Sequence, residues 1–180
     1  MSEFSESYHL RDVNIDEGVD LLRRSGLMGY VFPSINNWVS IVAEKNSFAP
    51  DRRIVSQNKG LLLHYVSAED HGWSFALFEG KKLVSAYDCN WDDEVHINDS
   101  RYSFEPLARI FGKNSKKRIL AIEHIFHPKN IDEAIDTEPS VVFAKAMKLP
   151  HFEWFAYDYV AHDYHEHPEE YAGVIKVARK

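Results

Sequence analysis

The stretch that decides the fold covers residues 61–88 and has the sequence LLLHYVSAEDHGWSFALFEGKKLVSAYD. Three runs within it, 61–66, 73–79 and 83–88, are rich in apolar, β-branched and aromatic residues, and each break between them contains a glycine. Breaks this short cannot hold the long crossover that parallel strands need. The stretch therefore predicts three consecutive antiparallel strands, a β-meander.

Strand-like runs also lie on both sides of this meander. The segment 29–43 contains an aromatic run, a turn that begins at Pro33 and a β-branched run, which together predict a hairpin. The aromatic segment 152–160 is predicted to be a long strand, and 173–178 to be a further short one.

Helical patterns occupy the remaining parts of the chain. Asn14 and Glu17 have the spacing of a capping box, and they predict a helix over 15–25. Between 103 and 150, apolar residues recur at helical spacing and are interrupted by glycine and proline. Further helices are therefore expected in this region.

Strands that cluster before residue 88 and return after residue 152, with helices between them, are typical of an α+β fold. We predict a single domain over 1–180, in which helices pack on one face of an antiparallel sheet. The residues expected to be buried against that face are Val19, Leu22, Ile119, Ile122, Val142 and Leu149.

The charge of the chain narrows the kind of partner. Its 180 residues include 21 Lys and Arg against 28 Asp and Glu, a formal net charge of −7. Such a charge repels nucleic-acid phosphates and attracts basic molecules. We therefore expect no nucleic-acid binding, and a protein partner rather than a small molecule.

Two further features bear on where the protein is located. The uncharged segment 25–43 contains proline and asparagine, which would leave polar groups unpaired in lipid, so no membrane interaction is expected. Cys89 is the single cysteine, and the first six residues lack the apolar core of a secretion signal. Both observations predict a cytoplasmic protein.

The segment that follows the meander combines negative charge with one aromatic side chain; its members are Asp88, Trp91, Asp92, Asp93 and Glu94. An exposed tryptophan is a frequent anchor at protein interfaces, and the charge around it raises the association rate and selects the partner. We predict that this segment binds a partner protein. The alternative is a solvated acidic loop above a buried Trp91.

Histidines are concentrated near the C-terminal end of the chain, at His162, His165 and His167. Imidazole nitrogens are common ligands of zinc and other transition metals. A divalent metal held by these three residues is one hypothesis, and a solvated loop is the other. No recognised ligand spacing such as His-Glu-x-x-His occurs.

Two functions therefore stay open. The first is a non-enzymatic domain that binds a basic protein through residues 88–94; by analogy alone, its size and charge would suit an immunity or antitoxin protein of a bacterium. The second is a small metal-dependent enzyme of hydrolase type, with its ion near 162–167. The sequence contains no nucleotide-binding loop and no nucleophile elbow, so we favour the first.

Overall fold

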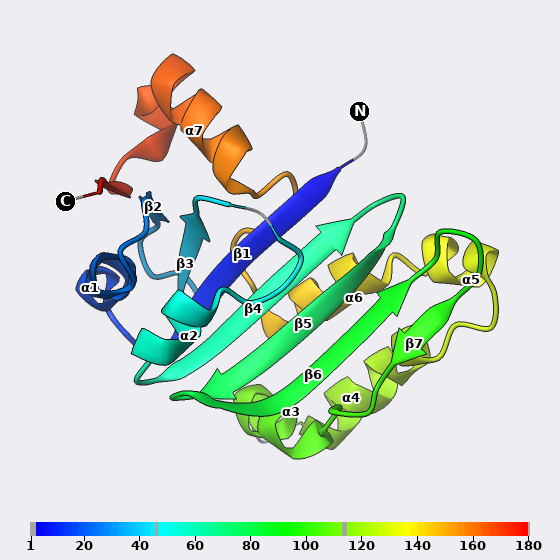
Figure 1. The fold of residues 1–180 in the computed structure, drawn as a ribbon. Coiled ribbons are helices and arrows are strands. Elements are labelled where there is room, and N and C mark those ends of the chain that lie inside the picture. The colour runs from blue at the N-terminus through cyan, green and yellow to red at the C-terminus, as the bar shows by residue number, and fades with distance from the viewer. Residues whose placement is uncertain (1–2, 46, 113–114, 180) are drawn as a thin grey trace.

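One antiparallel sheet forms the centre of the computed structural model, which describes residues 3–45, 47–112 and 115–179 (Figure 1). Its eight strands lie in the order β7-β6-β5-β4-β1-β3-β2-β8, and every neighbouring pair is antiparallel. The strands are β1 (Phe4–Arg11), β2 (Gly29–Val31), β3 (Trp38–Ala43), β4 (Leu61–Ala68), β5 (Gly72–Glu79), β6 (Lys82–Asn90), β7 (His96–Asn98) and β8 (Ile175–Val177). The helices are α1 (Ile15–Ser25), α2 (Arg52–Gln57), α3 (Phe104–Phe111), α4 (Ser115–Ile122), η2 (Glu123–Phe126), α5 (Ile131–Asp136), α6 (Pro139–Met147), α7 (Tyr157–Glu166) and η3 (Pro168–Tyr171).

The predicted α+β fold and its central meander are confirmed. β4, β5 and β6 are consecutive neighbours, with Leu61 opposite Glu79 and Gly72 opposite Asn90. The close approach of β6 requires glycine at position 72, because a Cβ there would lie 2.3 Å from the carbonyl oxygen of Cys89. The hairpin predicted over 29–43 is present as β2 and β3.

β1 lies in the middle of the sheet, between β3 and β4, and local hydrophobicity does not reveal it. Three of its polar residues, Ser5, Ser7 and His9, are completely buried. Buried polar groups need hydrogen-bond partners, and Ser7 and His9 bond to each other while His9 also bonds to Ser40 of β3. A partner this distant in sequence cannot be inferred from the composition of β1.

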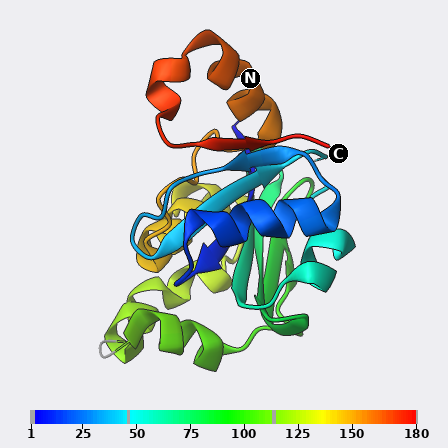
Figure 2. The same ribbon diagram turned by 90° about the vertical axis from the view of Figure 1, so that its left-hand side faces the viewer.

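Helices cover both faces of the sheet, which corrects the prediction that they pack on one face. α3, α4, α5 and α6 lie behind the sheet in Figure 1, whereas α1 and α2 lie on the opposite side, as Figure 2 also shows. The physical reason is visible within β4: the consecutive residues Leu62 and Leu63 point to opposite faces, and both are completely buried. The residues expected on one face are divided accordingly, with Val19 and Leu22 in one apolar cluster and Ile119, Ile122, Val142 and Leu149 in the other.

The prediction of a strand at 152–160 is wrong. Residues 157–166 form helix α7, which packs beside β2. Tyr157, Val160, Ala161 and Tyr164 have the spacing of one helix face, and all four belong to the apolar cluster around Tyr30. Aromatic content favoured a strand, but this helical period decides the local structure.

Part of the sheet has a face without a helix. In front of β5, β6 and β7, on the side where α2 covers β1 and β4, no helix of the described chain is present in Figure 1. One of the two hollows that make up the candidate site lies on this uncovered face.

Candidate functional site

Trp91 lies in the core rather than on the surface. Its side chain is only 6% exposed and belongs to the apolar cluster behind β4–β6. The cause is the period of the strand, because Tyr87, Cys89 and Trp91 are two residues apart and all point to the same buried face. The expectation that Trp91 is an exposed interface anchor is therefore wrong.

The acidic neighbours of Trp91 are exposed; they are Asp88, Asp92, Asp93 and Glu94. Asp92 Oδ1 lies 2.7 Å from His71 Nδ1, and this hydrogen bond raises the pKa of the His71 imidazole. Asp88 is opposite Ser74 in the β5–β6 register. Partial removal from water raises the pKa of the Asp88 carboxyl above its usual value.

A first hollow, of about 270 Å³, is lined by residues of the uncovered sheet face and of the β4–β5 turn. Asp88 and Asp92 both line it, so the structure brings together two of the residues predicted to bind a partner. Asp93 and Glu94 are not among its lining residues. The exposed ring of Phe48, from the segment between β3 and α2, lines the same hollow.

A second hollow, of about 180 Å³, is lined by Glu3 just before β1, by the β4–β5 turn and by residues of α5, of α6 and of the link between them. The carboxylate residues Glu3, Glu69 and Glu138 line it, together with Ile135, which is half exposed. Trp91 also lines this hollow, from its buried position.

The two hollows are adjacent, because Ala68 and Gly72 at the β4–β5 turn line both of them. No lysine or arginine is found among the described residues that line either one. A cationic group would thus be the complementary occupant. The carboxylate residues that line the pair are Glu3, Glu69, Asp88, Asp92 and Glu138.

Trp154 is an exposed aromatic residue beside the second hollow. It is 46% exposed and has a φ of 50°, a backbone conformation that is uncommon for a bulky residue. Its backbone N–H donates to Glu3 Oε1 at 3.0 Å, and the next N–H, of Phe155, donates to Ser5 Oγ at 3.0 Å. The indole also contacts the Tyr159 ring edge-on, at 5.5 Å between centroids. The ring is therefore exposed on a backbone that hydrogen bonds position, and a large exposed aromatic ring is a frequent interface anchor.

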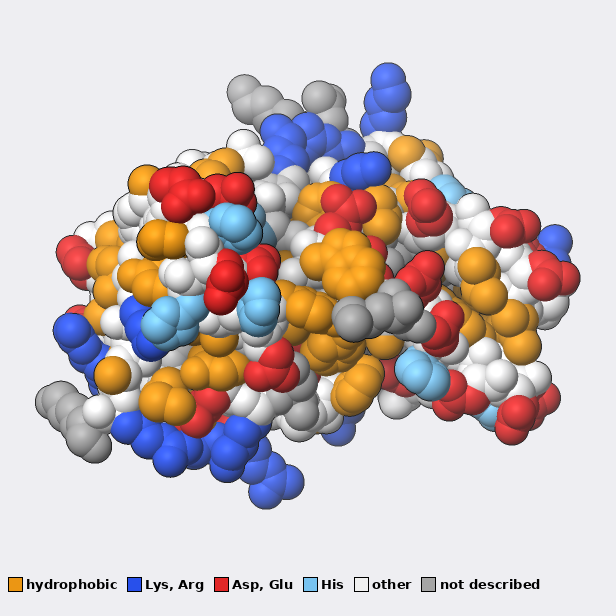
Figure 3. Space-filling view, turned by 90° about the horizontal axis from the view of Figure 1, so that it is seen from above, with side chains coloured by type: hydrophobic (Ala, Val, Ile, Leu, Met, Phe, Trp, Pro, Cys, Tyr) orange, Lys and Arg blue, Asp and Glu red, His pale blue; other side chains and the backbone are white. Residues whose placement is uncertain are grey.

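Like charges gather around Glu3. Burial raises the pKa of the Glu3 carboxyl, and the neighbouring carboxylates of Glu153 and Glu69 raise it further, against hydrogen bonds that lower it. Within the described ranges, no lysine or arginine forms an ion pair with these three residues. Figure 3, which views this end of the molecule, shows acidic side chains around a central hydrophobic area. We call the two hollows together with Trp154 the acidic end.

The predicted metal ligands lie on and just after α7. His162 and His165 are exposed on the helix, and His162 Nδ1 lies 3.2 Å from Asp163 Oδ1. His167 follows the last residue of the helix. The structure does not bring the ring nitrogens of these three histidines together as one group.

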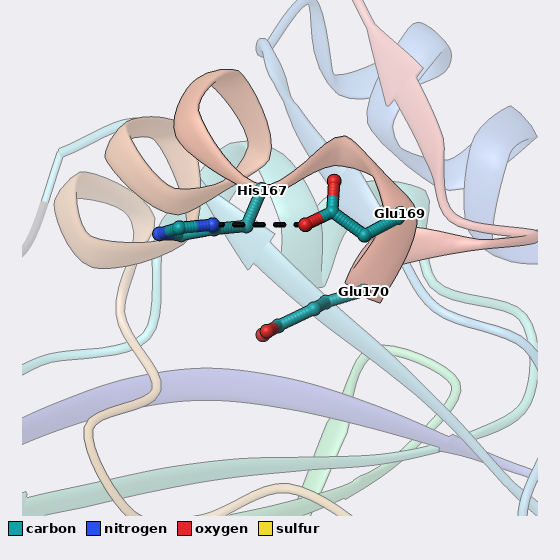
Figure 4. A group of neighbouring side chains, drawn as sticks. All are labelled: His167, Glu169 and Glu170. Atoms are coloured by element: carbon teal, nitrogen blue, oxygen red, sulfur yellow. Dashed lines mark ion pairs between the residues drawn. The ribbon is translucent and has the colours of Figure 1, made fainter.

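His167 instead has two carboxylates beside it (Figure 4). Its Nδ1 lies 3.7 Å from Glu169 Oε1, and one ligand atom each from His167, Glu169 and Glu170 fit within 4.8 Å of one another. All three residues are exposed. Such a group could hold a divalent cation, although exposed acidic groups are often this close without one.

Cys89, the only cysteine, is buried behind β6 and faces the core. Burial and the charge of Asp88 raise the pKa of its thiol, although a hydrogen bond with Tyr87 lowers it. A nucleophilic cysteine needs the opposite setting, an accessible thiol with a lowered pKa.

Comparisons with protein-family models, with curated proteins and with solved structures found no match. Throughout the described ranges, every helix is too short or too polar to cross a membrane.

Proposed function

We propose that this chain is a non-enzymatic binding domain that recognises a basic protein through the acidic end. One observation carries the proposal: two adjacent hollows present five carboxylate residues and no lysine or arginine among their described lining residues. Three large apolar side chains, Phe48, Ile135 and Trp154, are exposed beside or within them. Aromatic side chains are frequent anchors at protein interfaces, and surrounding charges contribute selectivity and association rate.

The two kinds of side chain would have different roles. Exposed carboxylates act over a distance of several ångströms and would mainly accelerate association with a basic surface. Trp154 and Phe48 would lose water-exposed apolar area in the complex and would mainly slow dissociation.

Proteins that bind nucleic acid carry clustered lysine and arginine, so they form one class of basic partner that this surface would suit. Toxins that act on nucleic acid belong to this class. An immunity-type or antitoxin-type role is consistent with the acidic end in this sense, and it rests on that analogy.

Partner capture from cells that express the chain, with two altered forms and one control, tests the proposal. Trp154→Gly removes the anchor and suits the positive φ at this position. A triple variant, Glu3→Gln, Glu69→Gln and Glu138→Gln, removes three charges, and the glutamine introduced at position 3 keeps an oxygen for the Trp154 N–H. The matched control removes three charges at exposed positions away from the acidic end, through Asp20→Asn, Glu105→Gln and Glu123→Gln.

The captured protein should be basic. Its affinity should fall about tenfold or more in Trp154→Gly, because an anchor residue is worth about 2 kcal/mol. Its affinity should fall about tenfold or more in the triple variant as well, because three attractive charges are lost. The control should bind as the unaltered chain does. Equal capture by all four forms, or capture of acidic proteins alone, would contradict the proposal.

The second candidate function is metal-dependent catalysis near 162–167. It is favoured by one observation, the proximity of His167, Glu169 and Glu170. Titration of untagged protein with zinc, followed by calorimetry, tests it: a site should bind one ion, and His167→Ala should abolish that binding while His127→Ala does not. Absence of zinc binding in the unaltered chain would exclude this candidate at these residues.

A further inference from the structure

A row of side chains crosses the uncovered face of the sheet and lines the first hollow. The register places Val66, Ser74 and Asp88 side by side on β4, β5 and β6. The row changes from an apolar side chain to a hydroxyl and then to a carboxylate. This gradient matches a ligand side chain that has an apolar stem and a charged tip.

Phe48 forms an aromatic wall of the same hollow, and hydrogen bonds to Glu6 position its backbone. The backbone N–H groups of Ser47 and Phe48 donate to Glu6 Oε2 at 2.9 and 3.2 Å. The other carboxylate oxygen of Glu6 lies 3.1 Å from His64 Nε2, and both side chains are buried. The Phe48 ring also contacts Phe4, at 5.1 Å between centroids. Because the wall is already ordered, less conformational entropy is lost on binding.

Asp88 supplies the charge at the polar end of the row. Within the described parts of the chain, no lysine or arginine forms an ion pair with Asp88. Asp92 adds a second carboxylate, which is hydrogen-bonded to His71, another residue that lines the hollow. Arg101 lines a neighbouring hollow that shares Phe48, Ser74 and Asp88 but is not among the residues that line the first. Charge complementarity thus points to a cation in the first hollow.

We propose that the first hollow receives one arginine side chain of the partner, with its guanidinium at Asp88 and its stem along Val66 and Phe48. The inference rests on the proposed function and names the group that this surface recognises. A volume of about 270 Å³ suits one side chain and is below the range of roughly 300–1,000 Å³ that larger ligands occupy. Arginine is preferred over lysine because guanidinium bonds a carboxylate with two N–H groups and stacks on an aromatic ring.

Nuclear magnetic resonance titration with small probes tests the pocket without the partner. The probes are Nα-acetyl-arginine amide, its neutral analogue Nα-acetyl-citrulline amide, and Nα-acetyl-lysine amide. The arginine probe should shift the backbone amide signals of Ser74, Asp88 and Asn90, which line the hollow. The citrulline probe should not shift them, and the lysine probe should bind about threefold more weakly or worse than arginine.

Three variants complete the test. Asp88→Asn should raise the Kd of the arginine probe about fivefold or more, and Phe48→Ala about threefold or more, because each removes one of its contacts. Asp93→Asn is the matched control: Asp93 is exposed in the same acidic segment but does not line the hollow, so the Kd should not change. The amide spectra of the free variants show directly whether each one is folded.

Binding of citrulline or lysine as tight as that of arginine would overturn the inference, as would an unchanged Kd in folded Asp88→Asn. These outcomes are separable from failure of the proposed function. If the arginine probe fails while Trp154→Gly still weakens partner capture, only the pocket is wrong. If the probe binds but partner capture is unchanged in Trp154→Gly and in the triple glutamine variant, the proposed function is wrong and the arginine site stands.

Discussion

His9 Nδ1 lies 2.9 Å from Ser40 Oγ, across the β1–β3 pair in which the two residues are register partners. The other ring nitrogen, Nε2, lies 2.9 Å from Ser7 Oγ, and the imidazole is completely buried. Burial, assisted by the nearby imidazoles of His151 and His64, lowers the pKa of His9 to about 3. The folded protein therefore holds this histidine in its neutral form.

Stability should consequently fall in acid because of His9. The unfolded chain gains a proton at this residue near its ordinary pKa of about 6.5, whereas the folded chain gains it only near pH 3. Between these values the unfolded state binds more protons, so the free energy of unfolding decreases as the pH falls, by up to about 1.4 kcal/mol per pH unit. Urea unfolding of the unaltered chain and of His9→Gln from pH 7 to pH 4 measures this slope.

The His9→Gln variant should lose most of that slope, whatever its stability at pH 7. His127→Gln, a change at an exposed histidine, should keep it. An equal slope in all three proteins would show that His9 is not the group responsible.

Trp91 and Trp154 should respond in opposite ways to truncation. Trp91 is 6% exposed and belongs to the apolar cluster behind the sheet, so Trp91→Ala should lower the free energy of unfolding by about 3–5 kcal/mol. Trp154→Gly removes an exposed ring at a positive φ and should change it by less than about 1 kcal/mol. Denaturant unfolding compares the two, and a small loss in Trp91→Ala would contradict the core position of that residue.

Two positions of α4 offer a matched pair for the packing of this helix. Ile122 is 5% exposed and Leu120 is 71% exposed. Ile122→Ala should therefore cost about 2–5 kcal/mol of stability, whereas Leu120→Ala should cost less than about 0.5 kcal/mol. The reverse order in thermal or denaturant unfolding would mean that α4 presents its other face to the sheet.

Cys89 should be inert toward thiol reagents in the native protein. Its side chain is 1% exposed and its thiol pKa is raised, so both access and thiolate formation are restricted. Ellman's reagent should not react with Cys89 in the native protein. When denaturant is added, the reaction should proceed at the rate at which the protein unfolds. Rapid reaction in native buffer would show that this part of the core opens readily.

The parts of the fold that sequence patterns predicted are those stabilised locally. The meander over 61–88 has short breaks and a glycine at each, so its pairing follows from neighbours along the chain. β1 and the pairing of β2 with β8 depend on partners far away in sequence. In addition, β1 contains buried serines, a residue type that is more typical of loops. The segment 152–160 has the composition of a strand, and only its helical period shows otherwise.

The candidate site could be predicted only in part for a related reason. The acidic residues after β6 are recognisable as a charged segment, but their grouping with Glu3, Glu69 and Glu138 comes from tertiary structure. The sequence does predict the inward position of Trp91, because this residue continues the alternation of the buried residues Tyr87 and Cys89. Trp154 carried no comparable signal, since its exposure depends on an unusual φ.

The central place of β1 has a consequence for synthesis on the ribosome. Ala68, the last residue of β4, follows Arg11 by 57 residues, so β1 waits roughly 3–11 s for its second partner at ordinary elongation rates. Arrested nascent chains that end before β4 should be cleaved by protease within β1, and longer ones should be protected there. A strand with two open edges invites aggregation during this interval. The serines and Glu6 make β1 hard to recognise as a strand from its sequence. The same residues keep this segment hydrophilic until β3 and β4 have been synthesised.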